Sequence, residues 1–243
     1  MNQASFLSLA HKKKLRCEKF LDEMKAVIPW DKLCKVIKPH YSKGKLGRKP
    51  MDLEMMVKIH CLQQWYNLSD PGCEEAIYDR NSFQKFLGID LLADEVPDET
   101  TILKFRHLLE SHKLPKKIFK IINRYLTEQG LLMKEGTIVD ATLIASAKST
   151  KNKDKNNARS EGVFWGVLDK AKRNHSLSSS QRKRNKKLAS VRAKVEHPFQ
   201  VIKCQWHYYK TRYRGIEKNA CQLYMLFSLH NIFKVRRILL AQV

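Results

Sequence analysis

The spacing of apolar residues changes once along this chain, and that change limits the folds it can adopt. Residues 1–130 carry apolar side chains three and four positions apart, the period of amphipathic helices. At Gly136 the pattern becomes a β-branched apolar run, GTIVDATLIAS, typical of a strand in a buried sheet. A second short strand is expected at GVFWGVL, residues 162–168. We therefore predict an α+β chain, mainly helical, with a helical region over 1–130 and a second domain over 131–243.

Stop and cap signals divide the helical region into separate helices. Pro29 ends the first one, and another is expected to start near Asp52 with one apolar face. After the sequence NLSDPG we expect a helix over residues 73–87. Glu74 and Glu75 would stand at its start, where carboxylates interact favourably with the helix dipole.

The helix in PDETTILKFRHLLE belongs to a helix pair that is a candidate DNA reader. Asp98 or Thr100 is expected to cap its start. Its apolar residues should face inward, with Lys104, Arg106 and His107 on the outer face. A short turn and another helix follow, an arrangement used by helix-turn-helix proteins that read the major groove. Most short helix pairs are packing units, so the pattern alone does not establish DNA binding.

Positive charge is concentrated in one part of the chain. Overall, 47 Lys and Arg oppose 24 Asp and Glu, a net charge of +23. From Lys148 to Arg214 there are 19 basic and 4 acidic residues, a net charge of +15. A polyanion is therefore the expected partner. We expect KRNHSLSSSQRKRNKK to be a mobile linker and a helix to run over about 189–206, while WHYYKTRYR, aromatic and basic, suits single-stranded nucleic acid.

The apolar runs predict neither a membrane span nor an export signal. No run approaches 18 residues, and the lysines near the N-terminus follow its short apolar stretch instead of preceding it. The six cysteines form no Cys-x-x-Cys pair, so a zinc site or disulfide framework is not expected. The sequence EKNACQLYMLFSLHNIFKVRRIL predicts a long helix, apolar all round in its middle, that lies in a core or a dimer interface.

Two carboxylates stand in unusual surroundings. Asp140 lies within the apolar strand pattern. Glu196 lies in a long basic segment, with Arg192 four residues before it and Lys203 seven after, all near one helical face. Such a glutamate could form a surface ion pair of little energetic value, or bind a metal beside cations that hold a DNA backbone.

Longer motifs carry a resemblance to a known family. The segments that carry it are VRAKVEHPFQVIK, RYRGIEKNACQLYMLFSLHNIF, LQQWYNLSDPGCEEAIYD, PDETTILKFRHLLE and GTIVDATLIASAKSTKNK. These five segments closely resemble bacterial insertion-sequence DDE transposases of the IS-five group, within the IS-four-like superfamily. The resemblance covers nearly the whole chain, in order. It implies a helical region that reads the inverted repeats at the element's ends, followed by a ribonuclease-H-like catalytic domain.

The resemblance also assigns roles to single residues. Asp140 and Glu196 match catalytic carboxylates that bind metal, and Arg192 and Lys203 match cations that contact the DNA backbone. Ala189 stands where the family pattern has a tyrosine. The implied activity is cutting and joining of DNA by phosphoryl transfer with Mg²⁺ (or Mn²⁺) as cofactor.

One expected ligand is absent from the sequence. The family has a second aspartate followed by Gly-Tyr, and no Asp-x-Gly-Tyr occurs in this chain. We predict an internal deletion joined near Arg159-Ser160, which removed the middle strands and this aspartate and left the ribonuclease-H-like domain incomplete. Asp169 is a better candidate substitute than Asp154, but a solvated aspartate among lysines is the favoured interpretation. Catalysis is therefore expected to be defective.

The predicted partner is DNA at the terminal inverted repeats, in the bacterial cytoplasm at the nucleoid, without membrane association. A homo-oligomer or a mixed oligomer with intact transposase is also expected. Further DNA contacts are predicted for Lys104, Arg106, Arg182, Lys183, Arg184, Lys210, Arg212 and Arg214. Three functions remain open: a defective transposase, a DNA-binding remnant that inhibits intact transposase, and a general basic nucleic-acid binder.

Overall fold

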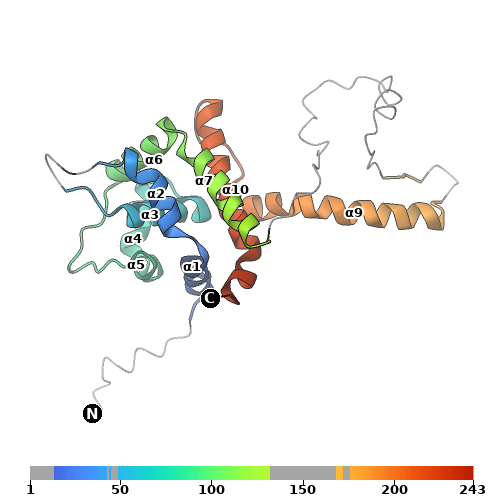
Figure 1. The fold of residues 1–243 in the computed structure, drawn as a ribbon, viewed down its shortest axis with the longest axis horizontal. Coiled ribbons are helices and arrows are strands. Elements are labelled where there is room, and N and C mark those ends of the chain that lie inside the picture. The colour runs from blue at the N-terminus through green and yellow to red at the C-terminus, as the bar shows by residue number, and fades with distance from the viewer. Residues whose placement is uncertain (1–13, 43, 45–48, 132–167, 172–175, 243) are drawn as a thin grey trace, which may run out of the picture. The chain divides into compact units, whose positions relative to one another are not determined.

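The computed structural model describes residues 14–42, 44, 49–131, 168–171 and 176–242 (Figure 1). Every regular element within these residues is a helix. Both predicted strands begin in segments that lie outside the described residues, so the sheet stays a prediction. The mainly helical character is confirmed for the described part.

The chain divides into two compact units, residues 1–133 with 202–243, and residues 134–201. The elements of the first unit are α1 (Arg16–Val27), α2 (Trp30–Ile37), the 3₁₀-helix η2 (Lys38–His40), α3 (Leu53–Tyr66), α4 (Asp70–Asp79), α5 (Asn81–Leu87), α6 (Glu99–Ser111), α7 (Leu114–Glu128) and α10 (Ile216–Leu240). In the second unit the structure describes α9 (Ser179–Gln200), and the π-helix η4 (Val201–Gln205) follows it.

Side-chain caps fix where three helices of the first unit, α3, α4 and α6, begin. The Asp52 carboxylate accepts a hydrogen bond from the backbone N–H of Met55 at 2.9 Å, and α3 starts there. Asp98 does the same for the N–H of Thr101 at 2.8 Å at the start of α6. These two predicted starts are confirmed, and the third cap, at α4, differs from the prediction.

The prediction of a single helix over residues 73–87 is wrong. Helix α4 begins at Asp70, because Ser69 caps it and Pro71 fits its first turn. Glu74 therefore lies in the middle of α4. Arg80 has an extended backbone, with φ −108° and ψ 104°, and it separates α4 from α5.

Helix α10, near the C-terminus, completes the core that the N-terminal helices form. It lies along α7 and also contacts α1 and α3 (Figure 1). Its side of the core includes Leu229, which is fully buried. Phe233 meets the ring of Phe20 on α1 with 5.8 Å between centroids, and Asn231 donates to Asn123 of α7 at 2.9 Å. The prediction that the middle of this helix lies in a core is confirmed.

This packing crosses the division of the sequence at residue 130. The predicted second domain covers residues 131–243. In the structure, residues 202–243 group with residues 1–133. Within the parts of the chain that the structure describes, no helix is both long enough and apolar enough to cross a bilayer.

Shortening Leu229 to Ala should destabilise the whole first unit. Loss of a fully buried leucine side chain costs about 2–5 kcal/mol of unfolding free energy. Urea unfolding followed by circular dichroism should show this loss in one transition. Leu223→Ala on the same helix, where the side chain is 37% exposed, is the matched control and should cost much less. Equal losses, or a separate transition for α10, would contradict the shared core.

Candidate nucleic-acid interface

Helix α9 carries the predicted glutamate and most of the predicted basic contacts of the second unit. It starts at Ser179, because Ser178 and Gln181 form a reciprocal capping box. The predicted start near residue 189 is therefore wrong, and much of the segment expected to be a linker is helical. Glu196 is exposed near the C-terminal end of α9. Arg192 lies one turn before it on the same helix, and its side chain is outside the described residues.

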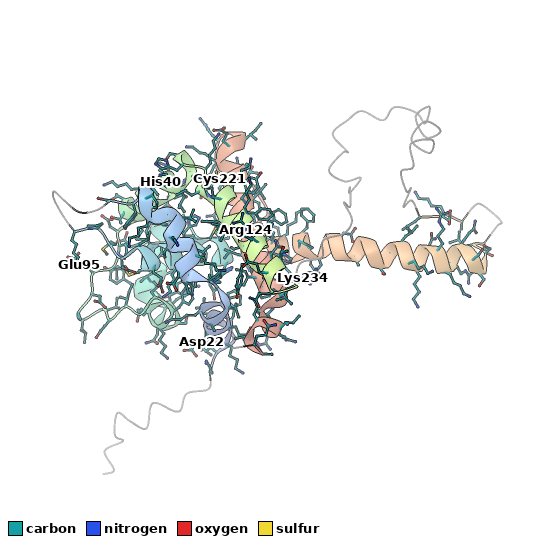
Figure 2. The ribbon with its side chains drawn as sticks, in the orientation of Figure 1. Asp22, His40, Glu95, Arg124, Cys221 and Lys234 are labelled. Atoms are coloured by element: carbon teal, nitrogen blue, oxygen red, sulfur yellow. The ribbon has the colours of Figure 1, made fainter. Side chains whose placement is uncertain are left out.

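The N-terminal half of α9 is crowded with cations. Its exposed basic residues there are Arg182, Lys183, Arg184, Lys186 and Lys187. Like charges four residues apart repel, and cations at a helix start oppose the helix dipole. Figure 2 shows side chains projecting from opposite sides of α9, which agrees with its exposed surface. An anion along this part of α9 would relieve the repulsion, so the charge pattern favours a phosphate backbone as its partner.

Asp169 is held beside the start of α9. Its backbone N–H donates to the Asn185 side-chain oxygen, and its carbonyl accepts from the Asn185 side-chain nitrogen, both at 2.9 Å. Arg184 approaches its carboxylate at 3.4 Å. Asn185 precedes Glu196 by 11 positions, which is about 16 Å along the helix axis. Asp169 and Glu196 therefore do not share a two-metal site in this arrangement, because its ions lie only about 4 Å apart.

The other predicted metal ligands are not brought together in the described part of the chain. Asp140 and Asp154 lie outside it. Within the described residues, no group of three or more His, Cys, Asp or Glu side chains could hold a metal ion. Glu196 alone does not provide the several oxygen ligands that Mg²⁺ needs, and Asp140 lies outside the described residues, so the metal site stays a prediction.

Arg106 does not lie on the outer face of α6, so the predicted orientation is wrong. The residue is 8% exposed. Its Nη2 donates to Asp70 of α4 at 2.8 Å, and its Nη1 donates to Glu110 at 3.0 Å. Gln63 also donates to Asp70, at 2.8 Å, and the ring of Tyr213 lies 4.6 Å from the guanidinium carbon. We call these five residues the Arg106 cluster.

The Arg106 cluster lowers the pKa of the Asp70 carboxyl. Burial by itself would raise the pKa of Asp70, but hydrogen bonds from Arg106 and Gln63 hold that pKa below its ordinary value of 3.8. A lowered carboxyl pKa stabilises the fold at pH values above the unfolded pKa. This stabilisation is lost as the pH falls through the lower pKa of the folded state. Lys104, two residues before Arg106, is exposed and stays a candidate contact.

A basic loop, which we define as residues 207–215, is anchored on the turn between α3 and α4. The side chain of Asn67 donates to the backbone oxygen of His207 at 2.6 Å. Arg212 donates back to the backbone oxygen of Asn67. Asn219 donates to the carbonyl oxygen of Tyr213 at 2.6 Å. Because Tyr213 also stacks on Arg106, the basic loop is fixed to the N-terminal helices at both of its ends.

The basic loop presents several predicted contacts together. Lys210, Arg212 and Arg214 are exposed along it, and Lys203 is exposed in η4 just before it. Sequence reasoning missed the anchor, Asn67. Asn67 has a left-handed backbone, with φ 50°, at the C-terminal end of α3. Asparagine tolerates this conformation better than most residues, so an asparagine after a helix was the one signal in the sequence.

Two family models match the chain, and both describe transposases. Residues 9–108 match the family described as Transposase domain (DUF772). Residues 165–232 match the family described as Transposase DDE domain, over α9, the basic loop and much of α10. Together these matches support the assignment of the chain to the DDE transposases. No solved structure matches the chain.

Replacing Arg106 with Met should leave the half-buried carboxylates of Asp70 and Glu110 without their cation. The unfolding free energy at pH 7 should fall by about 3–5 kcal/mol. In urea titrations the difference from wild type should shrink as the pH falls, because protonation of Asp70 in the variant removes the uncompensated charge. Lys104→Ala removes an exposed cation from the same helix and should change stability by less than about 0.5 kcal/mol. Similar losses in both variants would argue against the cluster.

Replacing Asn67 with Gly should loosen the basic loop while keeping its backbone turn, since glycine accepts the left-handed conformation. Loss of one hydrogen bond should speed amide exchange at Tyr208 and Tyr209 about two- to tenfold. Asn67→Ala removes the same bond and adds backbone strain, so it should cost about 1 kcal/mol more in unfolding free energy. Unchanged exchange in the glycine variant would show that the side chain does not anchor the loop.

Proposed function

We propose that the chain is a transposase of the IS-five group that binds the terminal inverted repeats of its element and does not cut DNA. The observation that carries this proposal is the composition of the first unit. Residues from the two ends of the sequence form one helical body with a shared core, and the proposed deletion near residues 159–160 lies outside that body. DNA binding and strand cutting can therefore be lost separately.

The distribution of charge supports binding to a DNA backbone. Exposed cations lie along the basic loop in the first unit and along the N-terminal half of α9 in the second unit. Of the predicted catalytic pair the structure describes only Glu196, and Asp140 lies outside the described residues. The support for loss of cutting is the missing Asp-x-Gly-Tyr of the sequence. We accordingly propose that Asp140 and Glu196 are the remains of a catalytic set, and that Arg192 and Lys203 retain backbone contacts.

We further propose separate roles for the two parts of the chain and an oligomer with intact transposase. Residues 1–130 would read the repeats, and residues 131–243 would hold the remnant of a ribonuclease-H-like domain. A mixed oligomer with intact transposase would let such a protein act as an inhibitor at the same ends, on the nucleoid of the bacterial cytoplasm. General nucleic-acid binding without sequence preference is the competing function, and the anchored basic loop is compatible with it.

A gel assay with purified full-length protein tests both parts of the proposal. Labelled duplexes from the two ends of the element, with Mg²⁺ or Mn²⁺, should shift without nicking, and a scrambled duplex should shift only at higher protein concentration. An Asp140→Ala variant should behave like wild type. Nicking by wild type that the variant lacks would show that a catalytic site survives, and equal affinity for scrambled DNA would favour the general binder.

Salt dependence tests the cations of α9. Replacing Arg182, Lys183 and Arg184 together with Ala should reduce the slope of log affinity against log salt by up to about 3, because each phosphate contact contributes about 0.9. Replacing the exposed Lys218, Lys234 and Arg237 of α10 with Ala removes the same charge as a matched control. The control should change the slope by less than one unit. Equal slopes for the two variants would remove α9 from the interface.

A further inference from the structure

The basic loop displays an aromatic pair that has no role in the core. Tyr209 is 67% exposed, whereas Trp206, three residues earlier, is buried and packs edge-on against Phe233. The rings of His207 and Tyr209 lie 6.2 Å apart between centroids and are tilted by 46°. Exposed aromatic rings gain little from facing water, so an adjacent pair on a loop points to a flat apolar ligand.

The backbone beneath this pair is held in an uncommon conformation. His207 has φ 56°, in the left-handed region that residues other than glycine rarely adopt. Its carbonyl oxygen accepts hydrogen bonds from the Asn67 side chain at 2.6 Å and from the Tyr209 backbone N–H at 3.1 Å. The N–H of Tyr208 donates to Ile202 at 3.1 Å. These bonds hold the backbone that carries the two rings in place before any ligand arrives.

Cations follow the aromatic pair directly. Lys210 and Arg214 are exposed, and Arg212 is exposed with one nitrogen bonded to Asn67. Aromatic rings beside a row of cations are the two components of single-strand recognition, in which bases stack on the rings and phosphates meet the cations. Inside a duplex both faces of a base are covered by its neighbours. An unpaired base has a free face for Tyr209.

We propose that Tyr209, with His207, is a stacking surface for an unpaired DNA base, and that Lys210 and Arg214 bind the flanking phosphates. The inference rests on the proposed function and names a further substrate feature, an unpaired nucleotide next to the duplex that the rest of the protein binds. A transposase meets such nucleotides where a strand has frayed or been cut at the end of an element.

Fluorescence of 2-aminopurine tests this proposal in the full chain, because stacking on an aromatic ring quenches it. The probes are a single-stranded oligonucleotide, a blunt duplex of the element's end, and the same duplex with a short 2-aminopurine overhang. Tyr209→Ala should bind the single strand about five- to 100-fold more weakly and should abolish quenching of the overhang. Tyr209→Phe retains the ring and should keep both. Tyr78→Ala removes a tyrosine on α4 that is 54% exposed and should also keep both.

The blunt duplex separates failure of the inference from failure of the proposed function. If Tyr209→Ala matches Tyr78→Ala on the single strand and the overhang while wild type shifts the blunt duplex, the stacking surface is wrong and DNA binding stands. If wild type binds none of the probes, both proposals are overturned. Equal losses in the Phe and Ala variants would also overturn the inference, because the hydroxyl and not the ring would then be responsible.

Discussion

The packing of α10 against α7 determines how the rest of the first unit is arranged. It brings residues 202–243 back to the helices at the start of the chain, through buried side chains such as Leu229 and the hydrogen bond between Asn231 and Asn123. The basic loop immediately precedes α10, so its position over the turn between α3 and α4 follows from that packing. Residues 202–232 lie in the segment that matches the DDE domain. They thus belong to the same compact unit as residues 9–108, which match the transposase domain (DUF772).

Charge is used in two different ways in this unit. Arg106 is placed inward, where two carboxylates and the ring of Tyr213 surround it, and it links α4, α6 and the basic loop. An ion pair of this kind contributes more to the choice of one arrangement than to net stability, because desolvation offsets much of the attraction. Lys210 and Arg214 remain exposed on the loop that this buried pair helps to position. The inward cation therefore helps to position the outward ones.

Local signals predicted the parts of this structure that depend on local chemistry. Asp52 and Asp98 marked the starts of α3 and α6 because a cap acts within its own turn. The charge of Arg106 predicts an exposed side chain, whereas its spacing predicts a buried one: it falls four residues after Ile102 and three before Leu109, on the buried face. The anchoring of the basic loop by Asn67 spans 140 positions in the sequence, so no local pattern could reveal it. The strand around Asp140 lies outside the described residues and stays a prediction.

The anchoring of the basic loop has a kinetic consequence. A loop that is ordered in the free protein loses little conformational entropy on association, so its contacts with a ligand are not offset by an ordering cost. Association through such a surface needs no preceding rearrangement, and its rate is governed by diffusion and by the long-range attraction between the cations and a polyanion. Residence time would then reflect the contacts made after arrival. Changes to the anchor would alter dissociation more than arrival, even though Asn67 itself touches no nucleic acid in this proposal.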